Sequence, residues 1–156
     1  MKLAEVLALI LLASSSLGAR QNPPQNSTPA SAAADYSGMY TFLQEGEFVQ
    51  ITVEDEGRVT GFISRYGNSE SDRGAFLDQF FKQGKLDGTK LTFTTDTVHG
   101  VWYDFTGTVD RGPGKTPADE AYYIVKGTLK EYRTDANKRV TSTSQEVQFK
   151  SFPHDM

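Results

Sequence analysis

Residues 83–95 read QGKLDGTKLTFTT, and this stretch decides the fold. Asp87-Gly88 is a strong signal for a two-residue hairpin turn. After the turn, Leu91 and Phe93 alternate with polar residues, which is the period of a strand with one buried and one solvated face. The stretch therefore predicts a β-hairpin of two antiparallel strands.

The same pattern continues on both sides of this hairpin. From Gly38 onward the chain divides into eight strand-like runs separated by turn residues. The runs are 38–43, 47–54, 58–66, 83–86, 89–95, 99–110, 120–132 and 139–151. Alternation within most runs indicates an antiparallel sheet. We therefore expect an all-β fold, an eight-stranded antiparallel up-and-down β-barrel.

One connection, residues 67–82, is too long for a hairpin turn. Its four large apolar residues recur at helical spacing. They are Phe76, Leu77, Phe80 and Phe81. Ser71 or Asp72 can cap the start of a helix, and Gly84 can end it. We expect one short helix between the third and fourth strands, with an ordered loop anchored by two phenylalanines as the alternative.

Residues 1–18 predict a signal peptide. A charged start precedes the apolar run VLALILLA at 6–13, and the small residues Ser16 and Gly18 suit cleavage after Gly18, with Ala19 as the other position. This run is far shorter than the roughly 20 residues that a membrane span needs, so no span is expected after cleavage. We therefore expect a secreted or periplasmic protein of the bacterial envelope.

The next segment, residues 19–35, has the composition of a disordered linker. Pro, Ser, Ala, Asn and Gln dominate it, and every aromatic residue of the chain lies between Tyr36 and Phe152. We expect one folded domain over 36–152 and a tail over 153–156. The chain has no cysteine, so this domain is expected to rely on core packing and sheet pairing alone.

Composition and motifs argue against several classes of function. A net charge of -4 without a clustered basic face argues against a nucleic-acid partner. The two histidines, His99 and His154, have no metal-ligand spacing, so neither a metal nor a cofactor is expected. Residues 112–116, GPGKT, lack the first glycine of a phosphate loop and precede a strand. The chain also lacks the Gly-x-Ser-x-Gly elbow, and no catalytic residue is predicted.

The best candidates for a binding site are polar residues that the two-residue alternation places on the same buried face as large apolar neighbours. Arg65, His99, Tyr103 and Gln145 are the four we select. A buried polar group left without a partner costs about 1–3 kcal/mol. Such groups either satisfy one another in a filled core or line a pocket and orient a ligand. We expect them to contact a small hydrophobic or amphipathic molecule, or a peptide, in the barrel mouth.

Gly38-Met39-Tyr40 opens the first strand, and residues 46–61 (GEFVQITVEDEGRVTG) form a second hairpin with buried alternation. With eight meandering strands, these features resemble the calycin group: lipocalins, fatty-acid-binding proteins and the avidin/streptavidin family. The whole chain is also similar to exported bacterial proteins. Biotin-binding members surround their ligand with several tryptophans, whereas this chain has Trp102 alone.

The avidin resemblance implies two further roles. The long loop after the third strand would lie at the open mouth, which implies binding by Glu70, Asp72 and Arg73; the alternative is a capped, salt-bridged helix start. Avidin-like proteins also pack barrels through outer faces, which implies a homo-oligomer through outward residues such as Trp102 and Tyr122. Coverage of these two rings within the chain is the alternative.

Three functions therefore stand side by side. The first is an exported small-molecule or peptide binding module. The second is a non-catalytic envelope interaction or structural protein with a filled barrel and an outer face used for partners. The third is a barrel isomerase or hydrolase that uses His99 as acid or base.

Overall fold

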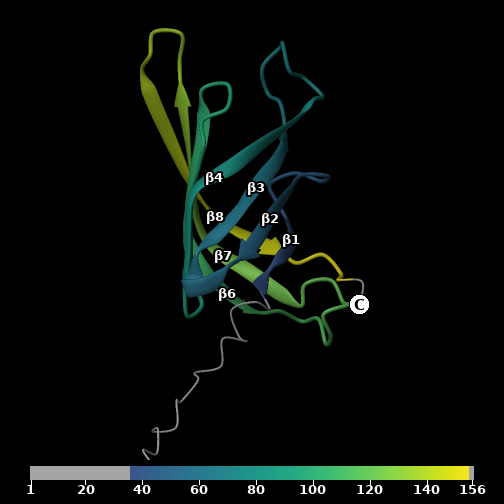
Figure 1. Cartoon of the computed structure of the whole chain (residues 1–156). Coiled ribbons are helices and arrows are strands. Elements are labelled where there is room, and N and C mark those ends of the chain that lie inside the picture. The colour runs from purple at the N-terminus through teal and green to yellow at the C-terminus, as the bar shows by residue number, and fades with distance from the viewer. Residues whose placement is uncertain (1–35, 155–156) are drawn as a thin grey trace, which may run out of the picture.

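The computed structural model of this chain describes residues 36–154. The expected signal peptide and linker, residues 1–35, lie outside the described residues, as do 155 and 156. The described chain folds into eight β-strands and one turn of 3-10 helix over Asp55–Gly57 (Figure 1). The strands are β1 (Gly38–Thr41), β2 (Phe48–Val53), β3 (Val59–Tyr66), β4 (Phe76–Asp87), β5 (Lys90–Thr95), β6 (Val101–Arg111), β7 (Tyr123–Thr134) and β8 (Val140–Lys150).

The sheet is an antiparallel meander in which each strand pairs with the next one in the chain. It curls until Tyr40 in β1 bridges Ser151, just after β8. Because β1 has four residues and β8 has eleven, this closure covers one end of β8 and leaves the rest of the seam open. The all-β, up-and-down barrel prediction is thus confirmed, in the form of a partly closed barrel.

The core lies inside the curled sheet, on the face that the alternation predicted. Its buried members include Val49, Ile63, Leu91, Val125 and Leu129, each with no exposed surface. Inward phenylalanines from adjacent strands stack beside these aliphatic residues. Burial of this face is the main contribution to folding that the structure shows.

The helix predicted between the third and fourth strands is absent from this part of the structure, and the prediction was wrong. Residues 76–87 form β4 instead, paired with β3 through registers such as Phe62↔Phe80. Phe80 points outward and is 58% exposed, whereas Phe81 points inward and stacks on Phe93 at 4.3 Å between ring centroids. A spacing of four residues returns to the same face in a strand as well as in a helix, so the pattern fitted both.

The outward phenylalanines of β4 belong to a larger group that we call the outer aromatic face. It consists of Phe48, Phe62, Tyr66, Phe76 and Phe80 on β2, β3 and β4. Neighbouring rings lie 4.5–5.8 Å apart between centroids. This face, with Phe76 50% exposed, was not predicted.

The two aromatic residues expected on the outer surface are partly covered within the chain. Trp102 stacks on Tyr132 with ring planes 2° apart, and the Arg111 guanidinium lies 3.4 Å from the ring centroid of Tyr122. Both rings are therefore half-buried rather than part of an open patch.

Four connections gather at one end of the barrel, which we call the polar end. They are residues 42–47, 67–75, 96–100 and 135–139. In Figure 1 this end is uppermost, and the β7–β8 hairpin projects from it. Among the described residues, no helix has the length and apolar character needed to cross a membrane.

Candidate functional site

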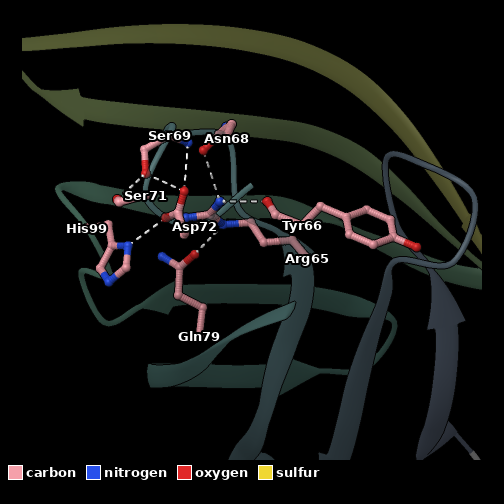
Figure 2. Close-up of polar contacts among 8 residues, drawn as sticks. All are labelled: Arg65, Tyr66, Asn68, Ser69, Ser71, Asp72, Gln79 and His99. Carbon is pink, nitrogen blue, oxygen red and sulfur yellow. Dashed lines mark hydrogen bonds and ion pairs between the residues drawn. The ribbon is translucent and has the colours of Figure 1, made fainter. Parts of the chain in front are cut away.

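Arg65 lies inside the barrel near the polar end and is 2% exposed. Side chains alternate between the two faces of β3, so Arg65 points to the same inner face as the buried residues Val59 and Ile63. Its Nε donates to Oε1 of Gln79 at 2.7 Å, and its Nη1 donates to the Tyr66 carbonyl and to Oδ1 of Asn68 (Figure 2). Its Nη2 is buried without a hydrogen-bond partner among the described residues.

Gln79 connects Arg65 to the next strands. This residue on β4 is fully buried, and its Nε2 lies 2.7 Å from the Val101 carbonyl, 2.9 Å from the Asp96 carbonyl and 3.3 Å from Oγ1 of Thr95. Thr95 Oγ1 also accepts from the backbone N–H of Tyr103. The network therefore joins β3, β4, β5 and β6 and fixes the orientation of the Arg65 guanidinium.

Tyr103 completes the network on β6. Its ring centroid lies 5.9 Å from Cζ of Arg65, and its hydroxyl donates to Oε2 of Glu131 on β7 at 2.9 Å. Burial raises the pKa of the Tyr103 hydroxyl, and the Glu131 carboxylate adds to this, while Arg65 opposes it. Tyr103 is therefore a neutral hydrogen-bond donor at physiological pH.

The connection over 67–75 lies beside Arg65 and is held by Asp72, whose side chain is buried. Oδ1 of Asp72 accepts from the N–H and the hydroxyl of Ser69, and Oδ2 lies 2.6 Å from Nδ1 of His99 in the β5–β6 connection. The Ser69 hydroxyl, followed by His99, lowers the pKa of Asp72 to about 2. An ionised Asp72 thus ties the 67–75 connection to the β5–β6 connection (Figure 2).

The contacts of His99 and Asp72 bear on the enzyme hypothesis. In nucleophilic catalysis a carboxylate binds one ring nitrogen of a histidine, and the other ring nitrogen faces the nucleophile. Here the carboxylate contact exists, but the nearest serine hydroxyls bond to Asp72 and to each other: Ser69 to Asp72, and Ser69 to Ser71. The side chain of His99 is 56% exposed, in a turn rather than in a cavity wall. This arrangement fits a structural link better than a catalytic group.

Of the four residues selected from the sequence, the structure brings two together. Arg65 and Tyr103 are buried side by side, as the alternation indicated. His99 was expected on the buried face and is exposed, because the tight turn at His99 and Gly100, with φ of 49° and 75°, breaks the alternation before β6. Gln145 faces inward beside Leu129 but is exposed, because β1 does not extend along this part of β8.

Two residues of the network, Gln79 and Glu131, and the nearby Glu47, which binds the N–H of Tyr66, were not selected from the sequence. Gln79 was placed in the expected helix, which concealed its inward position in β4. Glu131 could have been found by extending the alternation of β7 past Leu129. Glu47 lies in the β1–β2 connection, where its buried carboxylate accepts from the N–H groups of Gln44 and Tyr66. It could have been found by extending the alternation of Val49 and Ile51 back by two residues.

The opposite end of the barrel holds a hollow of about 320 Å³. Tyr40, Tyr122, Tyr123, Ser151 and Phe152 are among its lining residues. Burial raises the pKa of Tyr40, whose hydroxyl donates to the Tyr36 carbonyl. None of the four selected residues lines this hollow.

Comparisons with known proteins agree with the fold. No family model matches the chain, and no curated protein sequence matches it significantly. Among solved structures, the rhizavidin–biotin complex superposes with a TM-score of 0.58 and 14% identity over 81% of this chain and 100% of that chain. The chain has the fold of avidin-type barrels.

Two further structures support the same fold. Rhizavidin superposes with a TM-score of 0.57 and 13% identity over 80% of this chain and 87% of that chain. The bradavidin2–biotin complex gives a TM-score of 0.50 and 10% identity over 74% of this chain and 94% of that chain. Identities this low establish a shared architecture, and the chemistry of the site has to come from this chain's own residues.

The polar end offers hydrogen-bond chemistry. Within residues 36–154, no group of three or more histidine, aspartate and glutamate side chains is placed to hold a metal ion. What the site does offer is a buried guanidinium with unused N–H groups, next to a neutral tyrosine and a carboxylate. Such a set can recognise a molecule that carries an acidic group.

Proposed function

We propose that this chain is a small-molecule binding protein whose ligand carries an acidic group that pairs with Arg65. The observation that carries the proposal is the buried Nη2 of Arg65, which has no hydrogen-bond partner among the described residues. None of the ion pairs in this part of the chain includes Arg65. A buried guanidinium that makes no ion pair is costly, and a ligand carboxylate would supply both the contact charge and the acceptor.

The open seam between β1 and β8 is the route that we propose for the ligand. Thr141, Thr143 and Gln145 face inward along this seam and are exposed. Beyond them lie Glu131 and Tyr103, and then Arg65. The seam is polar and the interior behind it is aromatic, which suits an amphipathic acid with its carboxylate innermost.

The avidin-type fold supports a binding function but does not identify the ligand. Two of the similar structures, of rhizavidin and of bradavidin2, are biotin complexes. Biotin carries a carboxylate and is therefore a suitable probe. In this chain Trp102 stacks on Tyr132 on the outer surface, so the barrel interior is lined by phenylalanine and tyrosine instead of tryptophan.

The experiment begins with the protein purified from its own host and analysed by native mass spectrometry for a bound small acid. Biotin and octanoate are then titrated by calorimetry into the protein and into two variants, Arg65→Gln and the control Arg58→Gln. The Arg58 side chain is 68% exposed and lies outside the network. Arg65→Gln is expected to weaken binding about tenfold or more, which corresponds to a charge-assisted hydrogen bond of roughly 1.5–3 kcal/mol.

Two results would overturn the proposal. One is equal affinity of wild type and Arg65→Gln for every bound acid. The other is that no acid is found after purification and neither probe binds. Circular dichroism of Arg65→Gln shows whether a loss of binding comes from a loss of folding.

The outer aromatic face favours a second candidate function, an interaction protein. Phe76 and Phe80 expose half or more of their surface beside three further rings. Exposed aromatic clusters of this kind are typical of protein contacts. A Phe76→Ser/Phe80→Ser variant that loses a co-purifying protein while keeping the bound acid would assign this function in addition to ligand binding.

Export remains part of the proposal and rests on the predicted signal over residues 1–18. Fractionation of the host and N-terminal sequencing test it directly. A mature protein that begins at Ala19 or Arg20 outside the cytoplasm is the expected result, and an intact Met1 in the cytoplasm would contradict it.

A further inference from the structure

Two buried carboxylates lie near the Arg65 guanidinium, and among the described residues neither forms an ion pair with it. Glu47 accepts from the N–H of Tyr66, the residue whose carbonyl accepts from Nη1 of Arg65. Asp72 lies in the connection beside Arg65 and accepts from the N–H and the hydroxyl of Ser69. Hydrogen bonds to other groups therefore hold both negative charges near Arg65 but away from its free N–H group.

A third carboxylate, that of Glu131, lies between the open seam and Arg65. Its Oε2 accepts from the hydroxyl of Tyr103 at 2.9 Å, and the Tyr103 ring lies 5.9 Å from Cζ of Arg65. Its Oε1 pairs with Arg133, whose side chain is 47% exposed, whereas that of Glu131 is 17% exposed. The carboxylate is thus the more buried member of this pair, so water screens its charge less than that of the arginine.

These charges limit how much negative charge a ligand can bring into the barrel. Arg65 is the one buried cation among residues 36–154, and a single ligand carboxylate would offset its charge. A second negative charge on the same head group would meet no further buried cation and would lie among the three carboxylates. Like charges repel more strongly there than in water, because the effective dielectric constant of a protein interior is lower.

We infer that Glu131 determines specificity at this site, and that the site takes ligands whose acidic group carries one negative charge. The inference rests on the proposed function, because it concerns the acid that pairs with Arg65. Carboxylates and sulfate esters meet the requirement, whereas a phosphate monoester carries close to two negative charges and is rejected. Specificity of this kind comes from an unfavourable contact with the wrong ligand as well as from a favourable contact with the right one.

Three probes with similar alkyl chains separate charge from shape: octanoate, octyl sulfate and octyl phosphate. At a pH of about 8 the first two carry one negative charge and the phosphate carries nearly two, since its second pKa is near 6. The sulfate and phosphate groups are both tetrahedral, so the two probes differ chiefly in charge. Calorimetry with the full-length protein is expected to give similar affinities for octanoate and octyl sulfate, and an affinity for octyl phosphate that is weaker by about tenfold or more.

A variant of Glu131 tests its part in this selection. Glu131→Gln removes one negative charge and keeps an oxygen that can accept from the Tyr103 hydroxyl. It is expected to raise the affinity for octyl phosphate more than that for octyl sulfate, so that the ratio of the two affinities narrows severalfold. The matched control is Glu146→Gln on β8, because Glu146 is exposed and accepts from Thr128 away from Arg65. This control should keep the wild-type ratio, and circular dichroism checks that both variants are folded.

The possible failures are distinguishable. Equal affinities of wild type for octyl sulfate and octyl phosphate would overturn this inference, while octanoate binding that weakens in Arg65→Gln would still support the proposed function. Tight binding of octanoate with weak binding of both tetrahedral probes would assign the selection to shape instead of charge. An unchanged ratio in Glu131→Gln would show that Glu131 does not set the specificity. If no probe binds and no acid co-purifies, the proposed function fails, and this inference fails with it.

Discussion

Arg65 and Gln79 hold each other inside the barrel, where Nε of the arginine donates to Oε1 of the glutamine across 2.7 Å between β3 and β4. The same glutamine donates to the Val101 carbonyl on β6. A single neutral side chain therefore orients the buried cation and joins it to the next part of the sheet.

This relationship predicts that Gln79 contributes more to stability than Arg65. Gln79→Leu leaves the guanidinium buried with fewer partners and removes the side-chain donor to the Asp96 and Val101 carbonyls, at a cost of about 3 kcal/mol. Arg65→Met removes the cation together with its unpartnered Nη2 and is expected to cost about 1 kcal/mol. Urea unfolding of the two variants measures the difference, and an equal or larger loss for Arg65→Met would contradict this account.

Because residues 76–87 form a strand, truncating two adjacent phenylalanines is expected to lower the free energy of unfolding by very different amounts. Phe81 is partly buried and stacks on the core residue Phe93, so Phe81→Ala is expected to cost about 3 kcal/mol. Phe80 is 58% exposed on the outer face, so Phe80→Ala is expected to change the free energy of unfolding by less than about 1 kcal/mol. Similar losses for both variants in urea unfolding would instead indicate that the two rings share one buried face.

Asp72 predicts a component of acid sensitivity. Its pKa is lowered from 3.8 to about 2, chiefly by the Ser69 hydroxyl and next by His99. A lowered folded-state pKa contributes stability that is fully present above the unfolded-state pKa and is lost as the pH falls from about 4 toward 2. Asp72→Asn is expected to flatten the dependence of the melting temperature on pH over this range. An unchanged slope would show that the Ser69 and His99 contacts do not persist in solution.

The buried tyrosines predict a loss of stability in alkali. Burial raises the pKa of Tyr103 and of Tyr40. Above a pH of about 10 the unfolded chain releases these protons while the folded chain retains them, so the free energy of unfolding falls as the pH rises. Tyr103→Phe and Tyr40→Phe are each expected to make this fall shallower in urea unfolding between about pH 8 and 11. Parallel curves for wild type and both variants would disprove it.

The sequence predicted the architecture because the inward face of most strands carries a clear two-residue alternation. Each of the eight runs overlaps a strand, although β4 begins seven residues before its run at 83–86. The predicted turn at Asp87-Gly88 lies one residue before the observed turn, since Asp87 pairs with Lys90. The helix prediction failed at Phe76 and Phe80, whose spacing fits a helix and a strand equally. Their outward position was concealed because large aromatic residues are ordinarily a sign of burial.

Site residues were predictable only where they lie inside regular strands with a two-residue alternation. Arg65 and Tyr103 lie within regular strands, and their burial followed from their neighbours. His99 lies in a left-handed turn, where the alternation of a strand does not apply, and Gln145 lies on a part of β8 that has no neighbouring strand on its β1 side. The Asp72 contact joins residues 27 positions apart through two connections, and nothing local in the sequence encodes that distance.

The isolated bridge between Tyr40 and Ser151, which closes the barrel, also affects the order in which the barrel folds. Every other strand pair joins neighbours along the described chain, so each hairpin can form after closing only a short loop. The closing bridge must bring the two ends of the domain together, and the entropy of that step is offset by very few contacts. The meander is therefore expected to form first, with closure as a late and easily reversed event in folding. In the native state, this seam is where the barrel opens at the lowest free-energy cost.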